Sequence, residues 1–201
     1  MTHRAGVTLA SLLLAVGGCS SDAPSAPTDT GTQIRSDFAD ELFYAAPFPS
    51  DHRLVDGSVS MAGFPNPADI PFVGGLVGLL DGRADGFGTT SGIFFTLDGP
   101  IDRASLPSLE RSVEDDASMF LIAIDPEAPD YLQRHPLYAF FEEDGGPFGA
   151  SNMLSAVPLQ GVPLRARSRY AAVVTTAILS SDGEALAPSA LVSDLASGRP
   201  V

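Results

Sequence analysis

Apolar residues in this chain gather in short runs that are separated by turn signals. Each run is rich in β-branched or aromatic residues, and pairs such as Asp-Gly or Asp-Pro close it, which is typical of strands joined by tight turns. Few helical patterns lie between the runs, so the sequence favours a mainly β, antiparallel β-sandwich over alternating βαβ units. The predicted strands are residues 92–97, 118–124, 137–141, 153–158 and 170–179.

Two segments interrupt this strand pattern and predict short helices. Residues 70–80, IPFVGGLVGLL, are apolar throughout and are followed by Asp81-Gly82, so we expect a short buried helix there. The segment is too short to span a bilayer, which needs roughly twenty apolar residues. Residues 188–197 predict the second helix, because Leu191 and Leu195 are four apart and share one face.

The first eighteen residues have the layout of an export signal. Arg4 supplies a positive charge, an apolar run covers residues 7–16, and two small residues follow. The only cysteine of the chain, Cys19, comes directly after them. We therefore predict that residues 1–18 are a signal peptide and that the chain is cleaved at Cys19.

Residues 16–19, Val-Gly-Gly-Cys, resemble the lipobox of bacterial lipoproteins. The resemblance implies that the Cys19 thiol receives a diacylglycerol, that the chain is cut before it, and that the new amine is acylated. Acyl chains in this number hold a protein durably on a membrane. The alternative is a plain secreted protein with a chance cysteine near the cleavage site.

The segment after Cys19 divides the remaining chain into a tether and a folded body. Residues 19–37 are rich in Ser, Ala, Pro, Thr and Asp, a composition that stays disordered and extended, whereas residues 38–201 are long enough for one domain. This domain is predicted to be the β-sandwich, and the alternative that it is incomplete at its C-terminus stays open. By analogy with enteric bacteria, Ser20 after the cysteine favours the outer membrane.

Charge excludes one class of partner. The chain carries 25 Asp and Glu residues against 11 basic residues, all of them arginine, and its formal net charge is -14. Nucleic-acid binding needs a basic face, so no nucleic-acid partner is expected. The composition suits a protein of the cell envelope or the exterior.

A proline-rich stretch, residues 44–67, precedes the first clear strand. Its prolines fix the backbone in an extended form, and Asp56-Gly57 between two apolar pairs predicts a tight hairpin. His52 stands beside Ser50 and Asp51, a combination that also occurs in catalytic loops. We interpret the stretch as a strap that closes the start of the domain, with His52 at its surface.

Three longer segments carry a resemblance to known families, which implies that the β-sandwich of residues 38–201 is Ig-like. GIFFTLDGPIDRASLP resembles the opening of bacterial Ig-like domains, in which Asp102 and Ser105 would bond to nearby backbone groups. PLRARSRYAAVVTTAILSSDGEAL resembles a later strand of such domains, with Tyr170 placed like a tyrosine corner. PFPSDHRLVDGSV is similar to the start of secreted lipoproteins, some from myxobacteria, and of the Ig-like N-terminal region of exported lipases and esterases.

Catalytic motifs are weak in this sequence. The string Gly-Thr-Thr-Ser-Gly at 88–92 has the wrong spacing for a nucleophile elbow, and a strand follows it instead of a helix. After the predicted cleavage only His52 and His135 remain as histidines, and no spacing pairs either with a serine and an aspartate. We assign no catalytic residue and expect this chain not to be an enzyme by itself.

Metal and cofactor motifs are equally weak. Two histidines and a lipidated cysteine do not make a transition-metal site, so no metal ligand and no cofactor are assigned. Calcium needs only oxygen ligands, which three acidic groups could offer, but none follows the EF-hand spacing and we interpret them as turns. These groups are Asp81 with Asp85, Asp98 with Asp102, and Glu142, Glu143 with Asp144.

Together the patterns predict a surface lipoprotein that is anchored to the lipid bilayer through Cys19. Its predicted role is binding, adhesion or support of the envelope structure, and its partner is an unidentified protein or glycan. The alternative is the N-terminal Ig-like portion of a truncated exported lipase or esterase, whose α/β-hydrolase domain would lie beyond residue 201. An elbow motif between a strand and a helix in the coding sequence after Val201 would distinguish the two.

Overall fold

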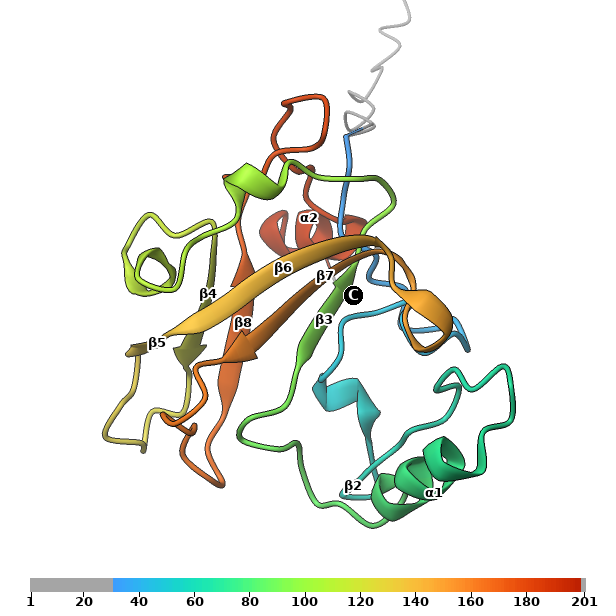
Figure 1. The fold of residues 1–201 in the computed structure, drawn as a ribbon. Coiled ribbons are helices and arrows are strands. Elements are labelled where there is room, and N and C mark those ends of the chain that lie inside the picture. Colours follow the sequence, from blue (N-terminus) through green and yellow to red (C-terminus); the bar gives the residue numbers. More distant parts are fainter. Residues whose placement is uncertain (1–30, 200–201) are drawn as a thin grey trace, which may run out of the picture.

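The computed structural model describes residues 31–199, and Figure 1 shows their arrangement. Two antiparallel sheets of three strands each form the larger part of the body. The first has the order β3-β7-β6, and the second has the order β5-β4-β8. The strands are β3 (Ile93–Thr96), β4 (Met119–Ala123), β5 (Arg134–His135), β6 (Leu137–Asp144), β7 (Ser151–Pro158) and β8 (Tyr170–Val174).

The two sheets share one apolar core. Strand β4 alternates between buried and half-buried positions, so Met119, Leu121 and Ala123 point inward, as period-two patterning requires. Across the core, β6 and β7 contribute Leu137 and Leu154, both fully buried. The prediction of a mainly β, antiparallel fold with one or two short helices is therefore confirmed. The full core cluster is Ile93, Phe95, Leu97, Ile101, Met119, Leu121, Leu137, Phe141, Leu154, Ala156, Ile178 and Leu186.

The turn after β3 forms as its sequence predicted. The Asp102 carboxylate accepts a hydrogen bond from the Ala104 amide at 2.9 Å, and the Ser105 hydroxyl donates to the Asp102 carbonyl at 2.6 Å. The same hydroxyl accepts from the Leu179 amide at 3.1 Å, so the turn also fixes a segment 74 residues away. The short 3-10 helix η2 (Arg103–Ser105) begins at this Asp102 cap.

Strand β8 is shorter than the predicted run of residues 170–179. It ends at Val174, and the Thr175 hydroxyl then donates to the Ser118 carbonyl and accepts from the Ala177 amide. These two bonds, one local and one to a residue 57 positions away, turn the chain out of the sheet and bring Ile178 into the core, where it is fully buried. The apolar run is thus divided between a strand and a core-filling turn.

Residues 37–91 form a smaller part of the body, which we call the N-terminal lobe. It has its own core of Phe43, Val59 and Met61, and Figure 1 shows it below and to the right of the sandwich. The ring of Phe43 lies 4.8 Å from Phe48 and 5.2 Å from Phe64. A bridge between Phe48 and Phe94 of β3 joins this lobe to the first sheet.

The predicted hairpin lies within the lobe. Strands β1 (Leu54–Val55) and β2 (Ser58–Val59) pair antiparallel around Asp56-Gly57. Both turn residues have positive φ, 52° for Asp56 and 79° for Gly57, which is the geometry of a type I′ turn. The 3-10 helix η1 (Asp51–Arg53) leads into it.

Helix α1 (Pro71–Leu80) confirms one prediction and corrects another. A helix forms where expected, but none of its residues is buried, so the prediction of a buried helix is wrong. Only Val73 and Val77 are half-buried, and Val77 packs on the small core of the N-terminal lobe. Apolar composition predicted the helix, but three buried residues offer too little surface to cover it on all sides.

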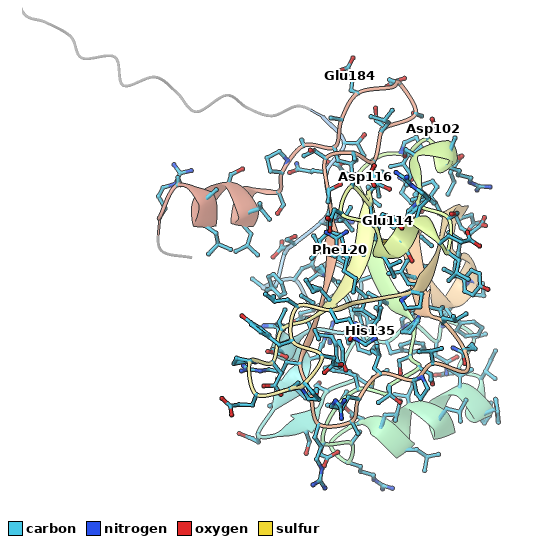
Figure 2. All side chains as sticks on the ribbon, turned by 90° about the vertical axis from the view of Figure 1, so that its left-hand side faces the viewer. Asp102, Glu114, Asp116, Phe120, His135 and Glu184 are labelled. Atoms are coloured by element: carbon cyan, nitrogen blue, oxygen red, sulfur yellow. The ribbon has the colours of Figure 1, made fainter. Side chains whose placement is uncertain are left out.

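Two features lie at the ends of the described chain. Helix α2 (Ala190–Ala196) forms where predicted, begins at a Ser189 cap whose hydroxyl accepts from the Val192 amide, and projects from the body in Figure 2. Gln33 and Ile34 form bridges with Ala187 and Leu97. Contacts of the folded body therefore begin before residue 38, the predicted start of the domain, because Ile34 packs against the sandwich core.

Candidate functional sites

Three places could carry function in the described chain: a polar cluster at one end of the second sheet, a pocket beside the strap, and the outer face of α1. The polar cluster consists of Asp130, His135, Arg165 and Tyr170. His135 lies in β5, and Tyr170 begins β8. Asp130 and Arg165 come from the loops that precede these two strands.

Tyr170 is the centre of the polar cluster. Its hydroxyl accepts a hydrogen bond from the Arg165 amide at 2.9 Å and donates to Asp130 Oδ2 at 3.2 Å. The first bond reaches the backbone five residues upstream, so the predicted tyrosine-corner geometry is confirmed. Arg165 Nε lies 3.4 Å from Asp130 Oδ1, which closes the triangle.

His135 completes the cluster. Its Nε2 lies 3.4 Å from Asp130 Oδ2, and its ring meets the Tyr170 ring edge-on at 5.2 Å. The side chains of His135 and Asp130 are 14% and 11% exposed. The Nε2 atom of His135 is buried without a hydrogen-bond partner among the described residues. Figure 2 shows His135 on the side of the body that carries β5.

The pKa values of the cluster follow its contacts. Burial acts to raise the pKa of Asp130, but hydrogen bonds from its own amide, Tyr170 and Arg165, with the charge of Arg165, outweigh it and hold this pKa below its usual value. Burial raises the pKa of Tyr170, and the Asp130 carboxylate adds to the effect, against the opposing amide and charge of Arg165. Asp130 is thus charged and Tyr170 neutral at neutral pH.

The arrangement fastens loops and has no nucleophile assigned to it. Asp130, Tyr170 and Arg165 tie the β4–β5 loop to the loop before β8, over a sequence separation of 40 residues. Beside them lies an open pocket of about 370 Å³, also lined by Gln133 and Pro163. Sequence reasoning missed this cluster except for Tyr170, because nothing local marks Asp130, His135 or Arg165 as partners.

The second place is a pocket of about 390 Å³ beside the strap. Ser50 and His52 line it, together with the turn that holds Asp37 and Asp40. His52 is exposed, as predicted, and its ring meets Phe38 edge-on at 5.2 Å. The carboxylates of Asp37 and Asp40 accept bonds from backbone amides of their own turn, which is a structural use.

Arg53 is the side chain of the strap with the firmest contacts. Its guanidinium donates to the carbonyls of Ala62 and Phe43 at 2.7 and 3.0 Å and stacks over the Phe43 ring at 4.4 Å. Burial lowers the pKa of Arg53. The strap is therefore held to the lobe's core by a cation that the sequence did not single out.

The predicted turns keep their structural role. The string at 88–92 is a polar turn, closed by the Ser91 amide and the Gly88 carbonyl at 3.0 Å, that leads into β3. In each calcium candidate group a carboxylate is already bonded within the chain: Asp81 to the Met61 amide, Asp98 to the Gln33 amide, and Asp144 to the Gly146 amide. Within residues 31–199, no three His, Cys, Asp or Glu side chains are grouped to hold a metal ion.

The third place is the outer face of α1. Phe72 is 73% exposed, Leu79 63% and Leu76 48%, and Ile70 and Leu80 are also exposed. Apolar side chains gathered in this way on one helix mark an interaction surface more often than scattered single residues do. We call the surface formed by Phe72, Leu76, Leu79 and Leu80 the α1 face.

Comparisons with known proteins add no family. No protein-family model, no curated protein and no solved structure matches the chain. Among the described residues, no helix combines the length and apolarity needed to cross a membrane. Cys19, the predicted lipidation site, lies outside the described residues.

Proposed function

We propose that this chain is an exported lipoprotein, anchored in the outer membrane through acylated Cys19, whose folded body is a binding module. The anchor rests on the lipobox-like residues 16–19. The binding role rests on one observation, the exposed α1 face. A partner that covers this face would remove apolar surface from water, which is favourable by about 25 cal/mol per Å².

The lipid anchor is tested in cells with a Cys19→Ala variant. The wild-type chain should incorporate labelled palmitate, sediment with membranes, and accumulate as a longer precursor when globomycin blocks the lipoprotein signal peptidase. The variant should lose all three properties. A variant that still takes up the lipid label, or that still shifts with globomycin, contradicts the anchor.

A second candidate function is that of the N-terminal portion of an exported lipase or esterase. The α1 face favours it as well, because a following catalytic domain is one kind of surface that could cover such a helix. The coding sequence after Val201 tests it. A nucleophile elbow between a strand and a helix supports this candidate, and a stop codon followed by unrelated sequence contradicts it.

A further inference from the structure

Two glycines lie beside the large side chains of the α1 face, and we call them the helix floor. Gly75 and Gly78 lie on the exposed side of α1, and a Cβ built on either would meet no atom within 4 Å outside the neighbouring helix backbone. Glycine weakens a helix relative to alanine, so these two positions lower helix stability without any need for close packing in this molecule. They leave room for a partner to approach the helix backbone closely beside Phe72 and Leu79.

Acidic residues lie at both ends of α1. Asp69 precedes the helix and Asp81 and Asp85 follow it, and all three are exposed. The N-terminal lobe has eight acidic residues against two arginines. Arg53 is already bonded to backbone carbonyls, and Arg83 is exposed between Asp81 and Asp85. The whole chain has a formal net charge of -14. The face is therefore an apolar stripe in a strongly negative setting.

We propose that the α1 face binds an apolar protein segment that carries basic residues on its flanks, such as an amphipathic helix with arginine or lysine beside its apolar stripe. This inference deepens the proposed binding role and names the partner's chemistry, while it does not depend on the lipid anchor. Apolar side chains of the partner pack on Phe72, Leu76 and Leu79. Its basic flanks face Asp69 and Asp85, which increases the association rate and selects against acidic partners.

The same charges disfavour the two other occupants of an apolar helix face. Membrane surfaces with anionic lipids repel an acidic protein, whereas they attract basic segments. A second copy of this chain, docked through the same face, would bring Asp69, Asp81 and Asp85 of both molecules together around the contact. A protein segment with basic flanks is the occupant that these acidic residues attract.

Binding is measured by fluorescence anisotropy on the exported chain, residues 19–201, with Cys19→Ser so that no acyl chain is added. The probe is a fluorescein-labelled amphipathic helix of leucine and lysine, about 18 residues long and thus longer than α1. A matched peptide of leucine and glutamate, and vesicles of phosphatidylcholine with and without anionic phosphatidylglycerol, serve as the competing classes. We expect that only the lysine peptide binds, and that its affinity falls as the salt concentration rises.

Three paired substitutions locate the site. Leu76→Ser with Leu79→Ser should weaken binding at least about tenfold, since these residues form the centre of the contact. Asp69→Asn with Asp85→Asn should weaken it several-fold and flatten the salt dependence. Val192→Ser with Leu195→Ser is the matched control on α2, where Leu195 is 57% exposed, and should leave the affinity within about twofold.

Every other result overturns the proposal in a recognisable way. Binding of the glutamate peptide or of vesicles, lost with the Leu76 and Leu79 substitutions, would keep a binding role for α1 but contradict the partner's basic character. Dimerisation through α1 in sedimentation would make a second copy the occupant. If the lysine peptide does not bind, or if the α2 control loses as much affinity as the α1 variant, the α1 face is not a docking site. None of these results bears on Cys19, which the palmitate label tests separately.

Discussion

The sandwich and the N-terminal lobe of this molecule bury their apolar side chains to different degrees. The sandwich core holds twelve buried residues from both sheets and from the segments that connect their strands, whereas the lobe's core holds three. On β4 of the sandwich the outward Phe120 is half-buried, and the guanidinium of Arg134 lies 3.8 Å from its ring. In the lobe, Phe72 of α1 stays 73% exposed.

This difference separates the part of the molecule that provides most of the stability from the part that offers a binding surface. Strands β6 and β7 have eight residues each and pair along nearly their whole length, while β1 and β2 have two each. Regions with small cores and few strand contacts open more readily than large ones, and binding surfaces are often drawn from them. We therefore expect the sandwich to set the global stability and the lobe to respond to partners.

The largest effect is expected from emptying the sandwich core. Phe141→Ala removes a fully buried ring at the centre of β6 and should lower the free energy of unfolding by about 4 kcal/mol, as core Phe truncations do. Urea unfolding followed by circular dichroism measures it. The control is Phe140→Ala, on the outer face of the same strand and half exposed, which should cost much less. Equal losses in the two variants would contradict the placement of this core.

A somewhat smaller effect is expected from the lobe. Phe43→Ala deletes the ring that contacts Tyr44, Phe48, Phe64 and Arg53, and should lower the local opening free energy by about 3 kcal/mol. Native-state hydrogen exchange measures it residue by residue. Amides of β1, β2 and α1 should lose protection while those of β6 and β7 keep theirs. Loss of protection throughout the body would show that lobe and sandwich unfold as one unit.

Tyr170→Phe sharpens the comparison within the sandwich, because it removes only a hydroxyl. Two hydrogen bonds are lost, one from the Arg165 amide and one to Asp130, so we expect a cost of about 2 kcal/mol. Tyr138→Phe, half exposed on β6, is the matched control and should be nearly neutral. A neutral Tyr170→Phe would mean that water replaces the hydroxyl without loss and that the loops need no such tie.

Acid should weaken the same tie. The pKa of Asp130 is lowered in the folded protein, so the unfolded chain binds this proton more tightly and stability increases with pH across the interval between the two values. The contribution of Asp130 is complete above its unfolded pKa, about 3.9 for a free Asp side chain, and disappears as pH falls through the lower folded value. Unfolding curves of wild type and Asp130→Asn should converge in this acid range. Parallel pH profiles of the two proteins would contradict the assignment.

The smallest effect is expected at the helix floor, and it has the opposite sign. Gly75→Ala should stabilise α1 by about 0.5–1 kcal/mol, because alanine is the better helix former and the new methyl group meets only open space. Thermal melts measure the change. The control is Gly57→Ala, at a φ of 79° in the β1–β2 turn, which should destabilise the protein. A destabilising Gly75→Ala would show that another part of the chain packs on this floor.

Local chemistry explains which features the sequence could predict. The Asp102 and Ser105 turn, the Asp56-Gly57 hairpin and the Tyr170 corner each depend on bonds that span at most five residues, so their residue types suffice. The strand positions follow for the same reason, because alternation and turn residues are local. The end of β8 at Val174 was missed, since the Thr175 hydroxyl that ends it bonds to Ser118, far away in sequence.

Long-range packing explains the rest. The link from Asp130 to Tyr170 spans 40 residues, and no spacing rule marks it. The burial of 70–80 was predicted wrongly because composition shows that a segment is apolar but not whether enough partner surface exists to cover it. That surface depends on the size of the lobe's core, which only the fold reveals. The place where sequence reasoning failed is also the place where we locate the binding surface.

The most direct test of the account is hydrogen exchange on the exported chain with and without the leucine-lysine peptide. The account predicts that added peptide increases protection of amides in α1 and in the β1–β2 hairpin, while exchange in β4, β6 and β7 stays unchanged. Protection that increases in the sandwich strands instead, or no change in α1 at saturating peptide, would contradict the claim that the N-terminal lobe carries the binding face.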